Sequence, residues 1–386
     1  MKGLFNLSHL SAGFTTVLVG YTSSVVIVIQ AATASGATPA QIESWLLTLG
    51  VVMGLTSILY SWFYKTPILT AWSTPGAVML AASAGQYSLS VVVGAFMLSG
   101  ALIALTGMIA PLTRALSKIP VPLGTAMLGA ILLPFCAKAF TPLTHTPVLF
   151  FLLFTSYLLA KHFAPRYTML ILLITSIGCA ITQGSFADTD LSLSIATPLS
   201  VEPEFDWLAL INLALPLYLI TMLSQNLPGI AMMKSYQYEA PIKPILLGTG
   251  LTNMLAAPFG GFSVNLAAIS AAICMAEEVD SDKTQRYRAV MWAGVFYLLA
   301  GIFAAAVVNL FLALPQPISA MLAGLALLGT LMMCLHTAFK TDEYREPALF
   351  TFIITLSGAT LFGMSATLIG LVVGLVYLRL SATSKK

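Results

Sequence analysis

Residues 66–83 read TPILTAWSTPGAVMLAAS, an apolar stretch interrupted by two prolines. Pro67 and Pro75 each lack a backbone N–H and clash with the preceding helical turn, so one continuous helix across the stretch is excluded. The residue before a proline also favours extended geometry. We therefore predict an extended segment over residues 68–72.

A helix can begin again at Pro75, with Ser73 or Thr74 as its cap. Over residues 75–85 this helix would be roughly 15 Å long, about half of a ~30 Å hydrocarbon core. The stretch therefore predicts a half-helix that starts near the middle of a membrane.

The composition places the whole chain in a membrane. Of its 386 residues, 58% are hydrophobic and 8% are charged, and the mean hydropathy is +0.93, so charges are too few to cover a soluble domain. The net charge of +3 is small and gives no indication of a nucleic-acid partner. We predict an all-α polytopic membrane protein. Its single cysteines within apolar segments predict buried thiols rather than a disulfide or metal site; they are Cys136, Cys179, Cys274 and Cys334.

Breaks in the apolar pattern divide the chain into fourteen segments, seven on each side of a polar loop at residues 185–206. The first seven lie at about residues 13–32, 42–64, 66–85, 90–112, 121–139, 146–161 and 167–183. The second seven lie at about residues 207–233, 241–256, 258–276, 289–313, 318–339, 348–362 and 363–380. The first has no cleavage pattern after it, and we interpret it as a retained span.

The positive-inside rule gives this topology a direction. With both termini in the cytoplasm, sixteen of the seventeen Lys and Arg residues fall on the inner side, and only Lys138 falls outside. The acidic residues of the central loop fall outside; they are Asp188, Asp190, Glu202, Glu204 and Asp206. We predict a multi-pass protein of a bacterial inner membrane.

Seven segments on each side of an outer loop would insert with opposite orientation, as inverted repeats over residues 1–184 and 207–386. Such repeats place the substrate site near the midplane, on discontinuous helices in corresponding positions. At an offset of 190, Trp72 and Ser73 match Phe262 and Ser263. We predict a second half-helix after Ser263, running to about residue 276. The third and tenth segments would then each combine a short extended stretch with a half-helix.

Two facing helix starts would form an electropositive, donor-rich site that suits an anion. The side chains of Ser73, Thr74, Ser263 and Asn265 would add donors and acceptors beside the starts at Thr74/Pro75 and Val264/Asn265. The alternative interpretation is that these residues only cap their own helices.

Two further polar groups lie in corresponding first segments of the halves. Gln225 and Asn226 follow Ser224 in the eighth segment, and Tyr21 and Gln30 lie in the first. Buried amides need partners, so interhelical hydrogen bonding is the alternative to substrate contact. Aromatic residues near the broken segments could hold an aromatic ring or simply pack; they are Trp72, Phe259 and Phe262.

No Asp, Glu, Lys or Arg lies near the middle of a predicted span, and the four histidines lie near segment ends. Hydrolysis, redox chemistry or phosphoryl transfer would need a nucleophile with a base, a metal or a phosphate-binding loop. We therefore expect no enzyme activity, no metal site and no cofactor.

Several motifs together resemble those of the benzoate/proton symporter family, BenE. They are AGFTTVLVGYTSS at 12–24, TAWSTPGA at 70–77, APRY at 164–167, LPLYLITMLSQNLPGIA at 215–231, SV, AAI and AAIC within 263–274, and MLAGLALL at 321–328. That family is similar in architecture to the uracil/proton symporter fold. The resemblance implies a core domain of segments 1–4 and 8–11 and a gate domain of segments 5–7 and 12–14.

The resemblance implies proton-coupled symport of benzoate or a related small aromatic carboxylate by alternating access. Uracil-type relatives carry carboxylates on the eighth and tenth segments, whereas this chain has Gln225 and Asn226 there and no acid until Glu277. An anionic substrate can supply that missing charge. A nucleobase-type transporter and a passive anion channel stay open as alternatives. The expected partners are the substrate, a proton and membrane lipid, with a homodimer left open.

Overall fold

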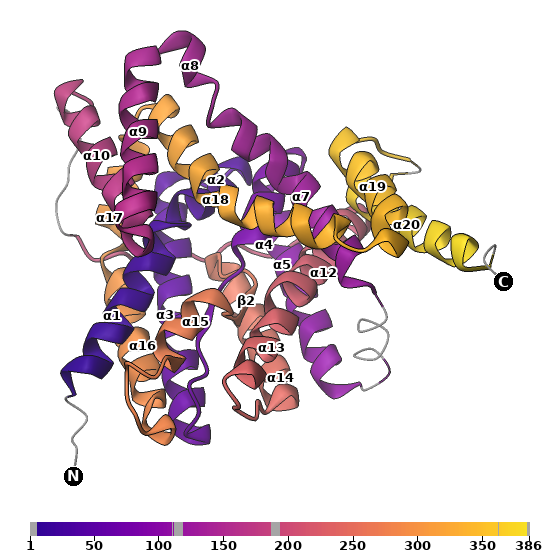
Figure 1. The fold of residues 1–386 in the computed structure, drawn as a ribbon, viewed down its shortest axis with the longest axis horizontal. Helices are drawn as coiled ribbons and strands as arrows, with labels where there is room; N and C mark the ends of the chain where they lie inside the picture. The colour runs from indigo at the N-terminus through magenta and orange to yellow at the C-terminus, as the bar shows by residue number, and fades with distance from the viewer. Residues whose placement is uncertain (1–5, 110, 112–118, 187–193, 362, 384–386) are drawn as a thin grey trace.

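The computed structural model describes residues 6–109, 111, 119–186, 194–361 and 363–383, and it is mostly helical (Figure 1). Within these residues, six helical runs are long and apolar enough to cross a membrane, or eight when two bent helix pairs are counted as spans. The coarse prediction of a helical membrane protein is confirmed. Some predicted features lie outside the described residues; they are Asp188, Asp190 and the segment ends Leu112 and Phe362.

The helices of the first half follow the predicted segments closely. They are α1 (Leu7–Thr22), α2 (Val25–Ala34), α3 (Pro39–Tyr64), α4 (Thr74–Ser83), α5 (Leu89–Met108), α7 (Val121–Lys138), α8 (Pro142–His145), α9 (Pro147–Phe163) and α10 (Thr168–Thr182). Short 3-10 turns extend two of them, η1 (Ala84–Gln86) after α4 and η2 (Pro165–Tyr167) before α10.

In the second half, one helical run covers residues 207–235 as α11 (Trp207–Ala209), α12 (Leu215–Thr221) and α13 (Leu227–Ser235), joined by the π turns η3 (Leu210–Ala214) and η4 (Met222–Asn226). The remaining elements are α14 (Ile242–Ala256), η5 (Ala257–Phe259), α15 (Ile269–Met275), η6 (Lys283–Gln285), α16 (Tyr287–Ile302), α17 (Ala304–Leu312), α18 (Gln316–Phe339), α19 (Asp342–Ser357) and α20 (Ala366–Thr383).

The first predicted span is longer than expected and bent. It begins at Leu7 rather than near residue 13, and α1 and α2 meet at an angle of 41°. At the bend, the hydroxyls of Ser23 and Ser24 both donate to the carbonyl of Gly20, at 2.9 and 2.8 Å. Serine hydroxyls that bond back to the preceding turn compete with the helix ladder and bend it.

The stretch at 66–83 folds as predicted, into strand β1 (Thr70–Trp72) followed by α4. Strand β1 pairs antiparallel with β2 (Val264–Leu266), with Ala71 opposite Asn265. Two bonds extend the pairing, from Ser73 N to Ser263 O at 3.0 Å and from Ala267 N to Leu69 O at 2.9 Å. The two broken segments therefore satisfy part of each other's backbone in the interior of the protein.

The second half-helix differs from its prediction. It was expected to begin directly after Ser263 and to reach about residue 276, but residues 264–266 form β2 and α15 spans only Ile269–Met275. Val264 and Asn265 are therefore strand residues and not a helix start. The reason is that β2 finds partners for its backbone in β1 and in two asparagine side chains described below.

Helix packing around the two strands crosses between the halves. Helix α3, which precedes β1, packs on α16, and α14, which precedes β2, packs on α5. Glycines allow the first contact, since a Cβ on Gly50 would lie 2.6 Å from the Cα of Gly301. Further along, α7 packs on α18, α9 on α10 and α19 on α20. Figure 1 shows β2 near the middle of the molecule, with the start of α1 and α16 toward one end.

Candidate functional site

Hydroxyl groups of α3 hold the first strand. The Ser57 hydroxyl accepts from Thr70 N at 3.0 Å, and the Thr70 hydroxyl lies 2.6 Å from that of Thr56. One turn away, the Ser61 hydroxyl accepts from Ile68 N at 3.1 Å. All four hydroxyl side chains are buried. They satisfy the strand's edge without placing a charge in the membrane.

Amide side chains hold the second strand. Asn253 of α14 forms two bonds with Val264, accepting from its N–H at 2.8 Å and donating to its carbonyl at 3.0 Å. The Asn226 amide oxygen accepts from Leu266 N at 3.0 Å, and its nitrogen lies 3.3 Å from the Met222 sulfur. For Asn226 the structure therefore shows the hydrogen-bonding alternative to substrate contact. Sequence reasoning missed Asn253, although an asparagine inside the apolar run LTNMLAA was a signal.

The start of α4 carries three of the predicted site residues. The Ser73 hydroxyl caps the helix by accepting from Gly76 N at 3.0 Å, and Ser73 is fully buried. Thr74 is the first helical residue and is half-buried, while Pro75 is buried and has no N–H to donate. Ser263 lies beside them, since its carbonyl accepts from Ser73 N and its hydroxyl accepts from Thr221 at 3.2 Å.

We call the place where β1 pairs with β2 the strand crossing. Two buried polar atoms near it have no hydrogen-bond partner among the described residues. They are the Tyr21 hydroxyl oxygen and the Asn265 amide oxygen Oδ1. Asn265 donates through its nitrogen to Ser263 O at 2.6 Å, which fixes the orientation of the amide. Tyr21 lies against Trp72, with ring centroids 5.1 Å apart, and the Trp72 indole N–H donates to Ser24 at 2.9 Å. A buried polar atom without a partner marks a place for a water or a ligand.

The remaining predicted residues differ in how far they are buried. Phe262 is fully buried between Trp45 and Phe96, at ring distances of 5.8 and 5.6 Å, and its contact with a substrate ring stays a prediction. Phe259 is 36% exposed. Gln30 of α2 and Gln225 of η4 are half-buried, and neither side chain hydrogen-bonds to another described residue.

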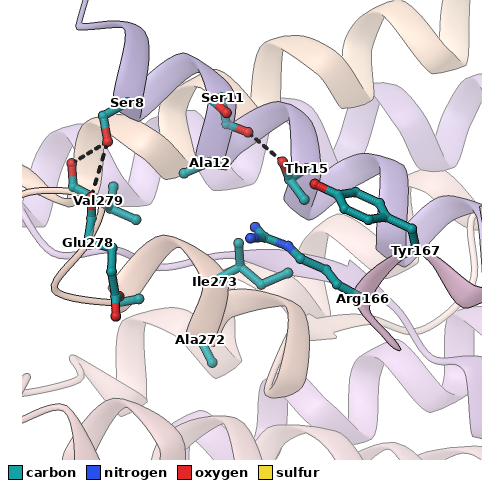
Figure 2. Close-up of a pocket in the computed structure, with 11 residues that line it drawn as sticks. Ser8, Ser11, Ala12, Thr15, Arg166, Tyr167, Ala272, Ile273, Glu278 and Val279 are labelled. Atoms are coloured by element: carbon teal, nitrogen blue, oxygen red, sulfur yellow. Dashed lines mark hydrogen bonds between the residues drawn. The ribbon is translucent and has the colours of Figure 1, made fainter. Parts of the chain in front are cut away.

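A cavity of about 620 Å³ opens beside α15, and its lining was not predicted as a site (Figure 2). Its walls come from the first half of α1, from η2 and from the end of α15 with the loop that follows. Figure 2 shows the Arg166 guanidinium pointing into this cavity. APRY at 164–167 was noted as a motif, but no role followed for its arginine. The lining residues are Ser8, Ser11, Ala12, Thr15, Arg166, Tyr167, Ala272, Ile273, Ala276, Glu278 and Val279.

Charged residues gather near the same end of the protein. His9 of α1 lies 2.9 Å from the Asp280 carboxylate, and the Arg286 guanidinium donates to Met275 O at 2.8 Å and to Asp280 O at 2.7 Å. The His9–Asp280 contact attaches the loop after α15 to α1, and Arg286 holds that loop against the end of α15. Within the described part of the chain, no group of three or more His, Cys, Asp or Glu residues could hold a metal ion.

Comparison with solved structures places the fold among anion transporters of low sequence identity. The transmembrane domain of a cyanobacterial bicarbonate transporter, BicA, matches with a TM-score of 0.63 at 16% identity, over 95% of this chain and 97% of that one. SLC26A9 matches at 0.63 and 13% identity, over 98% of this chain and 65% of that one. The likeness to the uracil symporter architecture stays a prediction.

Comparison with curated proteins gives two relatives over nearly full length. The inner membrane protein YdcO of Escherichia coli (strain K12) is 42% identical over 95% of this chain and 93% of its own length. The benzoate membrane transport protein of Acinetobacter baylyi (strain ATCC 33305 / BD413 / ADP1) is 35% identical over 97% of this chain and 95% of its own.

The family and the Acinetobacter baylyi relative are described as membrane transport proteins, which confirms the expectation of a transporter and not an enzyme. The resemblance read from the sequence motifs is confirmed as well, because the family model "Benzoate membrane transport protein" (BenE) matches residues 3–380. The chain belongs to the BenE family of benzoate membrane transport proteins.

Proposed function

We propose that this chain is a secondary active transporter for benzoate or a related small aromatic carboxylate, working by alternating access. The observation that carries the proposal is the crossing of β1 and β2, which leaves the Tyr21 hydroxyl and the Asn265 amide oxygen without partners among the described residues. The name of the Acinetobacter baylyi relative supports benzoate as the substrate, and the bicarbonate transporter of similar fold supports a transporter that carries an anion.

The architecture proposed with this function is fourteen segments in two inverted repeats, over residues 1–184 and 207–386, joined by the loop at 185–206. The exchange of helix contacts supports it: α3 before β1 packs on α16 after β2, and α14 before β2 packs on α5 after β1. A two-fold relation between the halves produces this pattern. Segments 1–4 and 8–11 form the proposed core domain, and segments 5–7 and 12–14 form the gate domain.

The proposed substrate position lies beside the start of α4. Thr74 is half-buried at this helix start, and Gln225, which is half-buried on η4, is proposed to contribute its amide groups. The positive end of the α4 dipole favours a carboxylate. Trp72 and Tyr21 supply an aromatic wall, with ring centroids 5.1 Å apart. Ser73, Ser263 and Asn226 shape this position by holding the backbone, because their side chains are already hydrogen-bonded to other groups.

The proton is proposed to travel on the substrate's own carboxyl group. The partnerless Asn265 Oδ1 supports this route, since an amide oxygen accepts hydrogen bonds and cannot donate one. Asn265 Oδ1 therefore suits the O–H of the acid after the proton has joined the substrate, whereas the α4 dipole suits the carboxylate before that step. Ala71, which faces Asn265 across the strand pair, is half-buried.

Flux in proteoliposomes tests the function. Neutral benzoic acid crosses lipid by itself and is trapped by an alkaline interior, and one-to-one symport reaches the same equilibrium. The informative quantity is therefore the protein-dependent initial rate, after subtraction of protein-free vesicles. We expect a rate that saturates with benzoate, rises with an inward proton gradient and does not respond to a membrane potential set with potassium and valinomycin.

The two alternatives give other results in the same assay. A passive anion channel gives a benzoate flux that follows the imposed potential. A nucleobase-type transporter gives saturable uracil uptake and no saturable benzoate uptake. Either result would overturn the proposed function.

The substrate position has its own test. We expect Gln225→Ala to lower benzoate affinity roughly 5- to 10-fold, the effect of losing one ordinary hydrogen bond of about 1 kcal/mol. Gln183→Ala removes an exposed amide at the end of α10 and serves as the matched control. Equal affinities in the two variants would show that the substrate lies elsewhere.

The remaining expectations are part of the proposal: a bacterial inner membrane, both termini in the cytoplasm, and a homodimer. The Escherichia coli relative is named an inner membrane protein, which supports the location. Fusing a reporter that is active only in the cytoplasm to each terminus checks the orientation. Light scattering of the purified protein, corrected for detergent, checks the oligomeric state.

A further inference from the structure

The cavity beside α15 has one arginine in its wall, and among the described residues no carboxylate pairs with it. Arg166 makes no ion pair or hydrogen bond with another residue in this part of the chain. Figure 2 shows its guanidinium directed toward α1, above Ile273 and near Thr15, while the Glu278 side chain at the rim points away from it. Arg166 is exposed to solvent, and its guanidinium carries five donors in a planar fork that matches a carboxylate.

The rest of the wall suits an aromatic ring. Ala12, Ala272 and Ile273 supply apolar surface, and the Tyr167 ring projects from η2 toward α1 beside Thr15 (Figure 2). The Thr15 hydroxyl proton is committed to Ser11 O at 2.8 Å, which leaves its lone pairs as acceptors only. The volume of about 620 Å³ lies within the ~300–1,000 Å³ typical of small-molecule sites.

The cavity is separate from the strand crossing. Its α15 residues are Ala272, Ile273 and, just past the helix, Ala276, whereas the crossing lies before Ile269. Seven residues of helix place the two ends of α15 roughly 10 Å apart. The walls also come from both proposed domains. Helices α1 and α15 belong to the core domain, whereas η2 begins segment 7, which belongs to the gate domain.

The geometry points to a second carboxylate subsite in this cavity, in which Arg166 binds the carboxylate of an aromatic acid and Tyr167 contacts its ring. The inference rests on the proposed function and adds a substrate position at the inner mouth of the transporter. The anion pairs with Arg166 there before moving along α15 to the crossing, or after leaving it. A single cation at the mouth also selects against neutral aromatic compounds and raises the local concentration of anions.

Transport and binding by Arg166→Gln test the subsite. We expect the variant to raise the KM and the dissociation constant for benzoate roughly 10- to 100-fold, the range for losing one charge-assisted pair. Arg166→Lys keeps the charge but lacks the planar fork of donors, so its KM and dissociation constant should lie between those of the unmodified protein and those of Arg166→Gln. Lys161→Gln is the matched control, because it removes an exposed cation five residues away that does not line the cavity.

A second measurement separates ligand binding from folding. Ser11 is exposed and lines the cavity, and the four native cysteines are buried, so Ser11→Cys gives one reactive thiol in the cavity. We expect benzoate to slow modification of this thiol by a charged methanethiosulfonate reagent, and benzamide, which is neutral, not to slow it. In the double variant that combines Ser11→Cys with Arg166→Gln, protection by benzoate should be lost.

The outcomes distinguish the two proposals. If the unmodified protein shows no saturable benzoate uptake, the proposed function fails. If it transports benzoate but Arg166→Gln behaves like Lys161→Gln, and benzoate protects the introduced thiol equally with and without Arg166→Gln, the subsite is overturned while the function stands. Equal protection by benzamide would also overturn it, because recognition would then not depend on the carboxylate.

Discussion

The two broken segments reach the same backbone arrangement with different side chains. β1 is held by hydroxyls of α3, whereas β2 is held by the amides of Asn253 and Asn226. After β1 the chain continues into α4, a ten-residue helix capped by Ser73. After β2 it continues into α15, a seven-residue helix without a side-chain cap at its start. At its other end, the second helix is anchored by Arg286.

The difference follows from what each half of the chain contains. Of the six asparagines, only Asn6 lies before residue 185, so the first half has no amide of this kind for its strand. A buried N–H is satisfied equally well by a hydroxyl or an amide oxygen, and either keeps charge out of the membrane. Two paired strands can therefore be held by different kinds of side chain, and a sequence match at an offset of 190 does not show which kind is present, so it misplaced the second helix start.

Removing the amide that holds β2 should have the largest effect. Asn253→Leu leaves both backbone groups of Val264 buried and unpaired, at about 1–3 kcal/mol each, so we expect a loss of ~2–6 kcal/mol and little folded protein. Ser57→Ala exposes one N–H of β1 and should have about half that effect. Thermal denaturation in detergent measures both. Thr252→Ala, which removes a hydroxyl bonded within α14, is the control, and a midpoint as high for Asn253→Leu would contradict the role of the amide.

The next largest effects on stability are expected in the turns that precede β1 and β2. Gly260 has φ of 87°, and a Cβ there would lie 1.7 Å from Trp45 Cδ1, so we expect Gly260→Ala to destabilise by about 2–5 kcal/mol. Gly36→Ala separates strain from collision, because its φ is 82° and nothing lies within 4 Å. In the turn before β1, Lys65 has φ of 51°, a conformation that glycine adopts easily, so Lys65→Gly should be tolerated. Equal denaturation midpoints for Gly260→Ala and Gly36→Ala would show that the contact with Trp45 is unimportant.

The caps of the two half-helices should give a smaller difference. Ser73→Ala removes a side-chain cap and should cost about 1 kcal/mol. Ala268→Ser should not stabilise α15, because Ala268 has a helical ψ of −68° where a capping residue needs an extended one. Denaturation midpoints in detergent check both changes, and a gain for Ala268→Ser as large as the loss for Ser73→Ala would contradict this difference.

The smallest effect on stability is expected at the partnerless hydroxyl of Tyr21. Tyr21→Phe removes a buried oxygen that bonds to no described residue, so the free energy of unfolding should change by less than ~1 kcal/mol. Benzoate affinity, measured by equilibrium binding, should fall several-fold if this hydroxyl meets the substrate. Unchanged affinity would show that the Tyr21 hydroxyl does not contact the substrate.

The sequence by itself determined the membrane class, the segment pattern, the break at Pro67 and Pro75 and the Ser73 cap, because hydropathy, proline geometry and capping are local properties. It also carried the family, through motifs spread over the chain. Only the tertiary structure decided that Val264 and Asn265 form a strand, that Asn253 and Asn226 hold it, that Phe262 packs inside and that Arg166 lies in a cavity with α1. The physical reason is that each of these depends on partners distant in the chain: a backbone N–H takes whichever acceptor the fold brings to it, and no spacing of residues along one segment records that choice.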